Sequence, residues 1–286
     1  TWCYRDAGGQ VLGYVYRFKK SDGGKEVLPL VWACNAEDGV TDWHFMAFPE
    51  LRPLYGLDRL AARPESTVLV VEGEKCADAG TAQLADLVSV SWPGGGKAVK
   101  KSDWAPLAGR KVILWADADA KRVPLTKADR DQLPDDAARK AAQDARPLLP
   151  EDQQPGVKTM AEVAEILLGL GCKVWRVKIP PPGEKPDGWD IADAVAEGLT
   201  GDALDKVIRA KGHFWLATRS EFLGELAIAG HQKTVSRMGR WWAAVPKNRW
   251  PDDGTFEEFP RRYRVVMQRH PGRKGARVEM AGAEVQ

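Results

Sequence analysis

The chain has 286 residues, of which 44% are hydrophobic and 29% charged, so it can form a packed, water-soluble core. No apolar run approaches the ~20 residues that cross a bilayer, and the polar start lacks a secretory signal, so we expect a cytoplasmic protein without a membrane partner. The net charge is +2, but residues 206–286 hold 16 Lys and Arg against 8 Asp and Glu, a net +8 that leaves −6 for residues 1–205. Such a basic region is typical either of a protein with a polyanionic partner or of a merely soluble surface.

The cysteines are scattered singly along the chain. None lies in a CxxC pair or near a matching histidine, so the spacing argues against a zinc site and against a disulfide framework. We expect a reducing compartment and a small, buried, apolar role for each of them. They are Cys3, Cys34, Cys76 and Cys172.

Residues 1–62 are predicted to form a β-rich subdomain. Gly-rich and charged turns separate three stretches of strand character, which is typical of an antiparallel meander. The expected strands are Val11–Phe18, Val27–Cys34 and Asp42–Phe48. A Pro-punctuated connector follows, with one short helix around Leu57–Ala62.

Residues 63–200 alternate between strand and helix patterns. This alternation predicts an α/β domain with a mainly parallel, four-stranded sheet flanked by helices. The expected strands are Thr67–Val71, Val88–Trp92, Lys111–Trp115 and residues 172–180, and the expected helices cover residues 74–87, 134–149, 160–171 and 189–199. A long polar insertion at residues 120–158 interrupts the domain, and it is interpreted as a lid, a partner-binding hairpin or a tether.

Residues 201–286 are predicted to form a small, basic α+β region. Helices are expected over residues 202–212 and 220–230, and residues 257–280 have the pattern of two paired strands. Between them lies a segment in which tryptophans alternate with cations: Arg237, Arg240, Trp241, Trp242 and Arg249. Aromatic groups among cations suit single-stranded nucleic acid, whose bases stack on rings. The alternative is that the tryptophans belong to the hydrophobic core and that their basic neighbours are exposed to solvent.

Acidic residues follow the expected strands of the parallel sheet. Glu72 follows the first strand, Asp117 and Asp119 follow the third, and Asp190 and Asp193 open the helix after the fourth. Ligands of parallel sheets gather at the carboxyl ends of the strands, so these carboxylates are expected at one edge. Oxygen ligands of this kind bind hard cations such as Mg²⁺. Each acid also has a structural interpretation, and Asp190 in particular has the position of a helix N-cap.

Basic residues lie near the same edge. Lys97, Lys100 and Lys101 belong to the Gly-rich segment 93–101, where ammonium groups and glycine amides would hold a phosphate. The spacing is not that of a P-loop, and a solvated loop is the alternative. Lys75 is interpreted either as a phosphate contact or as part of an ion pair on a helix face.

The motifs VLVVEGEKCADAG, VSWPGGGKAVKKSDWAPLAGRKVILWADADA and GWDIADAVAEG occur in this order along the chain. Together they resemble the Toprim domain, and the likeness is greatest to Toprim domains of phage- and plasmid-encoded primases and primase–helicases. The resemblance covers about residues 50–200, and we expect the N-terminal meander to belong to the same module. The long insertion after Asp119 departs from the family pattern.

The resemblance implies a role for each matching residue. Glu72 matches the family's glutamate that acts as general acid and base and helps to hold metal, and Asp117 and Asp119 match the pair that binds Mg²⁺ or Mn²⁺. Asp190 and Asp193 match a later acidic pair that extends the metal site. The implied reaction is metal-assisted nucleotidyl transfer.

Three functions remain open from the sequence. The first is RNA primer synthesis from NTPs on single-stranded DNA during replication of a phage, plasmid or other mobile element, with a replicative helicase, fused or separate, as a further partner. The second is a metal-dependent nuclease that uses the same acids. The third is a non-catalytic nucleic-acid-binding module. The chain does not begin with Met, so we expect it to be part of a longer protein.

Overall fold

The computed structural model describes residues 1–21, 23–35 and 39–209, followed by five short strands. These strands are β9 (Phe214–Leu216), β10 (Val235–Arg237), β11 (Arg240–Trp242), β12 (Tyr263–Val266) and β13 (Arg277–Met280). The chain divides into two compact units, Thr1–Phe214 and Trp215–Gln286. No helix in the described part of the chain is long and apolar enough to cross a membrane.

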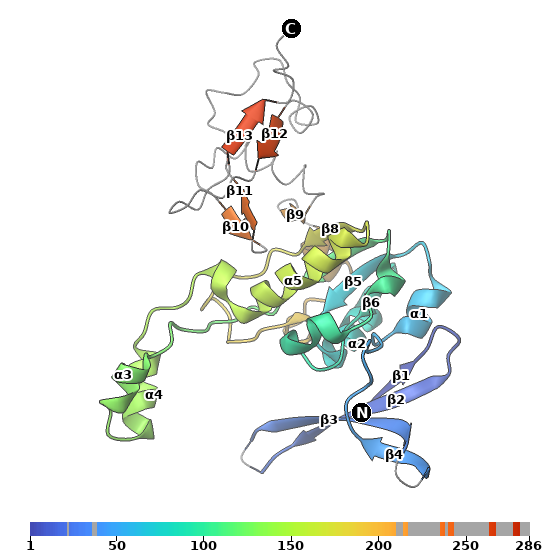
Figure 1. Ribbon diagram of the computed structural model, residues 1–286, viewed down its shortest axis with the longest axis horizontal. Helices are drawn as coiled ribbons and strands as arrows, with labels where there is room; N and C mark the ends of the chain where they lie inside the picture. Colours follow the sequence, from blue (N-terminus) through green and yellow to red (C-terminus); the bar gives the residue numbers. More distant parts are fainter. Residues whose placement is uncertain are drawn as a thin grey trace. The chain divides into compact units, whose positions relative to one another are not determined.

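The first unit begins with a four-stranded antiparallel sheet in the order β1-β2-β3-β4 (Figure 1). Its strands are β1 (Trp2–Arg5), β2 (Val11–Lys19), β3 (Lys25–Cys34) and β4 (Thr41–Phe45). The sheet confirms the expected meander and adds β1, which is too short to give a clear alternating pattern. Successive side chains of a strand point to opposite faces, and one face buries Tyr4, Val15 and Val31.

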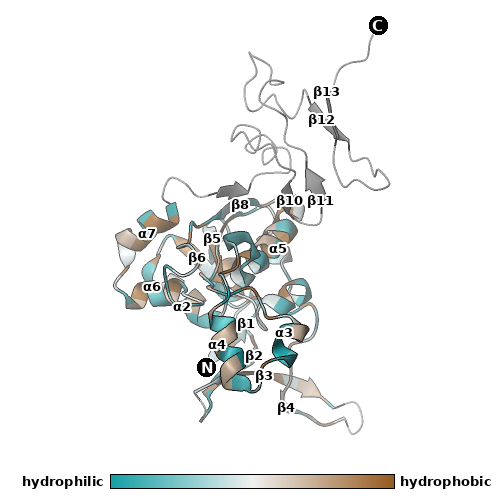
Figure 2. Ribbon diagram, turned by 90° about the vertical axis from the view of Figure 1, so that its left-hand side faces the viewer, coloured by the Kyte–Doolittle hydropathy of each residue, from teal (hydrophilic) through white to brown (hydrophobic). Residues whose placement is uncertain are grey.

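The centre of the first unit is a parallel sheet, as expected, and the structure gives its strand order as β6-β5-β7-β8. The strands are β5 (Thr67–Val71), β6 (Leu87–Val90), β7 (Lys111–Trp115) and β8 (Lys173–Arg176), and the strand order continues with β9, at which the unit ends. Apolar residues run without interruption through the central strands because both faces of a parallel sheet are covered. Figure 2 shows hydrophilic and hydrophobic residues alternating along the helices around this sheet.

Short helices cover and connect these strands. They are α1 (Leu57–Ala62), α2 (Glu74–Gln83), η1 (Gly96–Lys101), η2 (Ala105–Leu107), η3 (Glu151–Gln153), α5 (Pro155–Gly169), α6 (Ile191–Ala196) and α7 (Gly201–Arg209). The expected extension of α2 to residue 87 is wrong, because Leu87 opens β6 and pairs with Thr67. The strand expected to run to Trp92 ends at Val90, because Val70 opposite Val90 is the last pair between β5 and β6.

The insertion forms a hairpin that projects from the sheet (Figure 1). Its two extended segments pair through the Leu149 amide, which donates to the Lys121 carbonyl at 2.8 Å, and the Val123 amide, which donates to the Pro147 carbonyl at 2.9 Å. Two capped helices, α3 (Lys127–Asp131) and α4 (Asp136–Asp144), form its far end. The helix expected from residue 134 is therefore present but shorter, and the helix expected from residue 160 already begins at Pro155.

The strand pairs of the second unit are described by their backbone alone. Strands β10 and β11 form an antiparallel hairpin, and β12 pairs antiparallel with β13, which confirms the two strands expected within residues 257–280. The helix expected over residues 220–230 lies outside the described residues.

All four cysteines are free. Cys76 and Cys172 are buried, as expected, but the expectation is wrong for Cys34, which is exposed, and for Cys3, which is half-buried. Both of these lie in the N-terminal sheet, and Cys34 is the last residue of β3.

Polar contacts join the N-terminal sheet to α2. The buried Tyr4 hydroxyl donates to Oε1 of Glu74 at 2.7 Å, and Glu74 is itself only 8% exposed. Asp78, one turn further along α2, accepts from Trp2 Nε1 at 2.9 Å and from the Tyr55 hydroxyl at 2.8 Å. The first residues of the chain are thus fixed to the helix that follows the β5 strand end.

Replacing Tyr4 with Phe should lower the free energy of unfolding by about 2 kcal/mol at neutral pH, because the buried carboxylate of Glu74 loses its hydroxyl donor. Urea unfolding followed by circular dichroism measures the change. Tyr16→Phe, at a half-buried position of the same sheet, is the control and should have little effect. Equal midpoints for the two variants would contradict the role given to this contact.

Candidate metal and phosphate site

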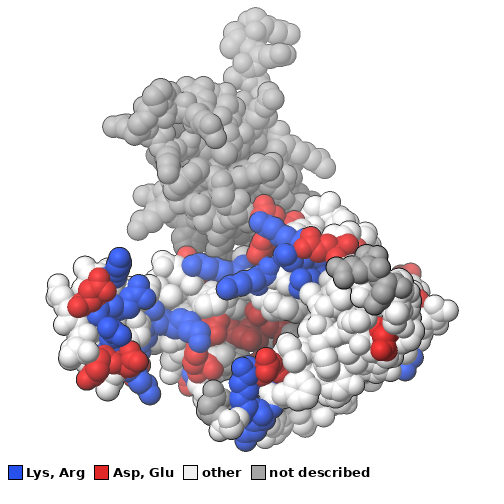
Figure 3. All heavy atoms as spheres, turned by 60° about the horizontal axis from the view of Figure 1, so that its bottom comes forward, with Lys and Arg blue, Asp and Glu red and all other residues white. Residues whose placement is uncertain are grey.

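Two neighbouring strands bring the predicted catalytic acids together. Strand β5 pairs in parallel with β7, and Val71 lies opposite Trp115 in the last register position. Glu72 therefore leaves the sheet beside the segment that carries Asp117 and Asp119. Figure 3 shows acidic side chains gathered in a hollow, with basic side chains around its rim.

Glu72 lies at the strand end with part of its side chain shielded from water. Its Oε1 atom is buried and has no hydrogen-bond partner in the described structure. Burial, and next the negative charge of Asp119, raise the pKa of Glu72 to about 7. A carboxylate with such a pKa exchanges a proton easily at neutral pH.

Asp117 lies within electrostatic reach of three other carboxylates. Burial and then the charges of Glu72, Asp190 and Asp119 raise its pKa to about 8, while the charge of Lys25 acts against this rise. Three carboxylates that disfavour the ionised form of a fourth leave an unmet need for positive charge at Asp117. The cluster is therefore suited to a cation or to a proton.

Asp119 is fixed by the start of α5. The Gly156 amide donates to its Oδ2 atom at 2.6 Å, and a side chain at Gly156 would lie 2.6 Å from the Asp117 carbonyl oxygen. Only glycine allows this close approach of the helix to the loop that follows β7. Gly156 is not among the residues predicted from the sequence; the signal for it is a glycine directly after a proline at a helix start.

Gln154 was also missed, and it holds the base of the insertion hairpin. Its side chain is buried, accepts from the Lys121 amide at 2.9 Å, and donates to the carbonyls of Lys121 at 3.1 Å and Leu149 at 2.8 Å. The same residue precedes α5, which carries Gly156. The hairpin and Asp119 are thereby fixed to one helix start.

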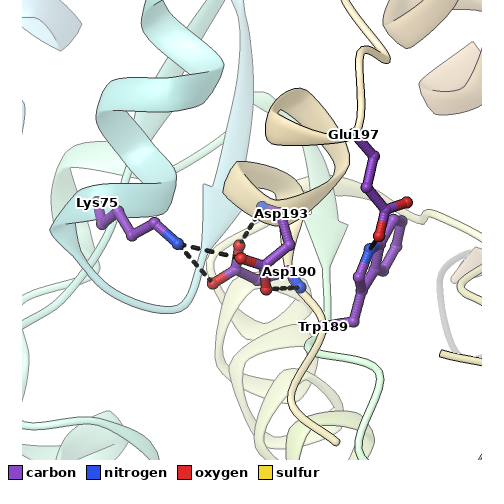
Figure 4. A network of polar contacts seen from close by, with 5 residues as sticks. All are labelled: Lys75, Trp189, Asp190, Asp193 and Glu197. Carbon is purple, nitrogen blue, oxygen red and sulfur yellow. Dashed lines mark hydrogen bonds and ion pairs between the residues drawn. The ribbon is translucent and has the colours of Figure 1, made fainter. Parts of the chain in front are cut away.

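Asp190 and Asp193 form a reciprocal cap at the start of α6 (Figure 4). The Asp193 amide donates to Asp190 Oδ1 at 2.9 Å, and the Asp190 amide donates to Asp193 Oδ2 at 3.3 Å. The structural interpretation of Asp190 as an N-cap is thus confirmed. Its charge nevertheless acts on Asp117, so capping does not remove it from the cluster.

A backbone bridge explains why α6 starts beside the cluster. The Ala118 amide donates to the Trp189 carbonyl at 2.8 Å, and the Gly188 amide donates to the Ala118 carbonyl at 3.1 Å. The ring of Trp189 is held in turn by its Nε1 donor to Glu197 at 3.0 Å (Figure 4). The residue after Trp189 is Asp190, which therefore lies next to the strand end of β7.

Lys75 lies across these caps. Its Nζ atom is 3.2 Å from Asp193 Oδ1 and 3.9 Å from Asp190 Oδ2 (Figure 4). Burial disfavours the ammonium, but the carboxylates of Asp190 and Asp193 outweigh it and raise the pKa of Lys75. Lys75 is thus in an ion pair, but its partners belong to the start of α6 and not to the face of its own helix, and Asp193 is engaged through both of its oxygens.

The lysines of the Gly-rich segment are placed in η1. Lys100 pairs with Glu162 of α5 at 3.2 Å, and Lys101 pairs with Glu50 at 2.9 Å. Lys97 is exposed, and its side chain has no partner in the part of the chain that the structure describes. Of the three, Lys97 is therefore the one whose ammonium is free for a phosphate.

The predicted residues of the C-terminal region are placed only in part. Arg237 ends β10, and Arg240, Trp241 and Trp242 form β11, with Arg237 opposite Arg240 in the register. The structure describes the backbone of these four residues and not their side chains, and Arg249 lies outside the described residues.

The carboxylate cluster fits a magnesium ion by the chemistry of its donors. All are hard oxygen ligands, and one buried oxygen of Glu72 has no partner. Within the described residues, no three His, Cys, Asp or Glu side chains are close enough to enclose an ion by themselves. Mg²⁺ is usually held by one or two carboxylates together with waters and substrate phosphates, so it does not need such an enclosure.

Comparison with solved structures finds primase catalytic domains at low sequence identity. The Aquifex aeolicus primase, containing the zinc-binding and RNA polymerase domains, is 16% identical with a TM-score of 0.41, over 79% of this chain and 42% of that one. The E. coli primase catalytic core is 18% identical with a TM-score of 0.43, over 80% and 56%. A DnaG primase catalytic domain bound to single-stranded DNA is 17% identical with a TM-score of 0.37, over 79% and 56%. The chain thus spans about half the length of these proteins.

One family model matches a different part of the chain. The model of the cobalamin synthesis protein cobW C-terminal domain matches residues 190–271. The match begins at the α6 cap and continues into the second unit, and it covers less than a third of the chain. It does not include Glu72, Asp117 or Asp119.

Proposed function

We propose that this chain catalyses metal-dependent nucleotidyl transfer on nucleic acid, and that its reaction is the synthesis of RNA primers from NTPs on single-stranded DNA. The observation that carries the proposal is the convergence of Glu72, Asp117 and Asp119 at the carboxyl edge of a parallel sheet. The order of the sequence motifs supports primer synthesis, and with it a setting in the replication of a phage, plasmid or other mobile element.

Asp117 and Asp119 would hold Mg²⁺ or Mn²⁺, and Asp190 and Asp193 would extend this set. When bound, the ion neutralises phosphate charge and makes the attacking hydroxyl more acidic. Glu72 has a pKa near 7, so it can take the proton of that hydroxyl and later return it.

The basic residues would bind the anionic substrates. Lys97 would contact the triphosphate directly. Lys75, Lys100 and Lys101 would also contact it once their ion pairs with carboxylates open. In the C-terminal region, the single-stranded template would lie on Arg237, Arg240, Trp241, Trp242 and Arg249. We further propose that residues 1–62, 63–200 and 201–286 act as three functional parts, with a replicative helicase as a further partner.

Primer synthesis on single-stranded DNA with labelled NTPs and Mg²⁺ or Mn²⁺ tests this proposal. Asp117→Asn/Asp119→Asn should reduce NTP-dependent products by at least about a thousandfold, because the charge that stabilises the transferring phosphate is lost. Asp136→Asn is the matched control, since this carboxylate belongs to the exposed helix α4 and should leave synthesis unchanged.

Other results would replace the proposal. Degradation of the template that disappears in the double variant would assign the same acids to a nuclease. If wild type and double variant bind DNA equally and neither makes products nor degrades DNA, the chain is a binding module.

A further inference from the structure

The outer face of the N-terminal sheet is unusually apolar for a surface. In the described part of the chain, all the large hydrophobic side chains that are exposed lie between Val11 and Leu51. Trp32 is 55% exposed and Phe45 is 60% exposed. A contiguous apolar patch of this kind marks an interaction surface more often than an isolated exposed residue does.

The register of the sheet puts the exposed aromatic side chains on one face, whereas the exposed Val27 lies on the other. Residues of β2 at alternate positions lie opposite alternate residues of β3 and β4, with Trp32 directly opposite Trp43. We call the resulting set the aromatic face: Tyr14, Tyr16, Phe18, Trp32, Trp43 and Phe45. The opposite face holds the buried Val15 and Val31, so the aromatic face points away from the core.

The rings of the aromatic face form a continuous series. Ring centroids are 6.0 Å apart for Phe18 and Tyr16, 6.1 Å for Tyr16 and Phe45, and 6.4 Å for Tyr16 and Tyr14. The series continues from Tyr14 to Trp43 at 5.5 Å and from Trp43 to Trp32 at 5.3 Å. It therefore crosses three strands without a gap and offers ring surface for several flat groups.

The end of the β2–β3 hairpin carries positive charge. Lys19 and Lys25 are opposite each other at its end, and the register puts them, together with Arg17, on the face of Val15, which is the face opposite the aromatic face. The charge of Lys25 counteracts part of the rise that burial and neighbouring carboxylates cause in the pKa of Asp117, so this end of the hairpin lies within electrostatic reach of the candidate site. Arg17 acts in the same way on Glu74.

We propose that the aromatic face binds single-stranded nucleic acid by base stacking, and that the cations at the end of the β2–β3 hairpin hold the phosphates of that strand where it approaches the carboxylate cluster. This inference rests on the proposed function, because it supplies the template for that reaction. Stacking on exposed rings tolerates any base, and a strand that passes around the end of the hairpin meets cations on the other face, which complement a polyanion. A four-stranded antiparallel sheet with exposed aromatic side chains is a surface on which bases are known to stack.

Fluorescence anisotropy of a labelled oligothymidine, without metal or NTP, tests this inference. Trp32→Ala/Phe45→Ala should raise the Kd at least about tenfold, from the loss of two stacking rings. The dependence of log Kd on log salt should keep its slope, since no phosphate contact is removed. Lys19→Ala/Lys25→Ala should instead make that slope shallower.

Leu51→Ala is the control, because Leu51 is 66% exposed but lies outside the strands of the sheet. Both altered rings are more than half exposed, so the melting temperature of the double variant should stay within about 3 °C of wild type. An oligonucleotide without bases should bind wild type as weakly as the intact one binds the double variant.

Equal Kd values for wild type and Trp32→Ala/Phe45→Ala, or no binding by wild type, would overturn the inference. If sedimentation then shows that the same substitutions turn a dimer into a monomer, the face joins two copies of the chain. The proposed function is tested separately: primers made by a protein whose aromatic face does not bind DNA leave that function standing. If the aromatic face binds DNA but the protein makes no primers, the inference stands and the proposed function is contradicted.

Discussion

Asp117→Asn should make the metal-free protein more stable at pH 8.5 while it removes activity. In the folded state the pKa of Asp117 is about 8, raised by burial and by neighbouring carboxylates. In the unfolded chain the pKa of an aspartate is about 3.9, so the folded state holds its proton more tightly. The contribution of Asp117 to stability is therefore fully present below about pH 3.9 and is lost as the pH rises through 8. Asparagine cannot ionise, so the variant escapes this loss.

The expected gain is about 2 kcal/mol at pH 8.5, or roughly 4–8 °C in melting temperature, and close to zero below pH 4. Thermal unfolding between pH 4 and pH 9 in the presence of a chelator measures it. Asp136→Asn, in the exposed helix α4, should follow the wild-type curve at every pH.

Mg²⁺ should reverse the order of the melting temperatures of wild type and Asp117→Asn. An ion that binds only the folded state stabilises it in proportion to the logarithm of its concentration over Kd. At pH 8.5 millimolar Mg²⁺ should therefore raise the melting temperature of wild type and leave that of Asp117→Asn nearly unchanged. Equal shifts in both proteins, or a loss of stability in the metal-free variant at pH 8.5, would contradict the assignment of Asp117.

Gly156→Ala should destabilise the protein by about 2 kcal/mol and reduce nucleotidyl transfer about a hundredfold. The added methyl group would lie 2.6 Å from the carbonyl oxygen and 3.1 Å from the amide nitrogen of Asp117. Both are backbone atoms, so α5 has to move away from the loop after β7. The Gly156 amide then loses its 2.6 Å contact with Asp119, and the acids lose their spacing.

Gly169→Ala is the matched control in the same helix. An added side chain there meets no atom within 4 Å, and alanine is the better helix former. We expect unchanged activity and a stability gain of up to about 1 kcal/mol. Urea unfolding and primer synthesis on both variants measure the effects. Similar behaviour of the two variants would mean that the close approach at Gly156 has no special role.

Local sequence patterns determined the central strands and the strand-end acids. Thr67–Val71 and Lys111–Trp115 are strands with the predicted bounds. Uninterrupted apolar runs that end in charge leave few alternatives, because a strand covered on both faces must be apolar throughout. The parallel sheet then places Glu72 and Asp117 at one edge, which is why these two could be identified without coordinates.

Contacts between distant residues decided the rest. Strand β1 exists because Tyr4 is buried against β2 and donates to Glu74, and α2 ends early because Leu87 pairs with Thr67. Asp190 reaches the cluster through the bridge between Ala118 and Trp189.

No local sequence pattern indicates the close approach of Gly156 to Asp117 or the hydrogen bonds of Gln154 at the base of the hairpin. Composition and periodicity report the state of a segment, whereas the spacing of a site depends on which segments touch. In this protein the sequence by itself therefore determined the strands and their terminal acids, and only the tertiary structure decided how those acids are spaced, capped and paired.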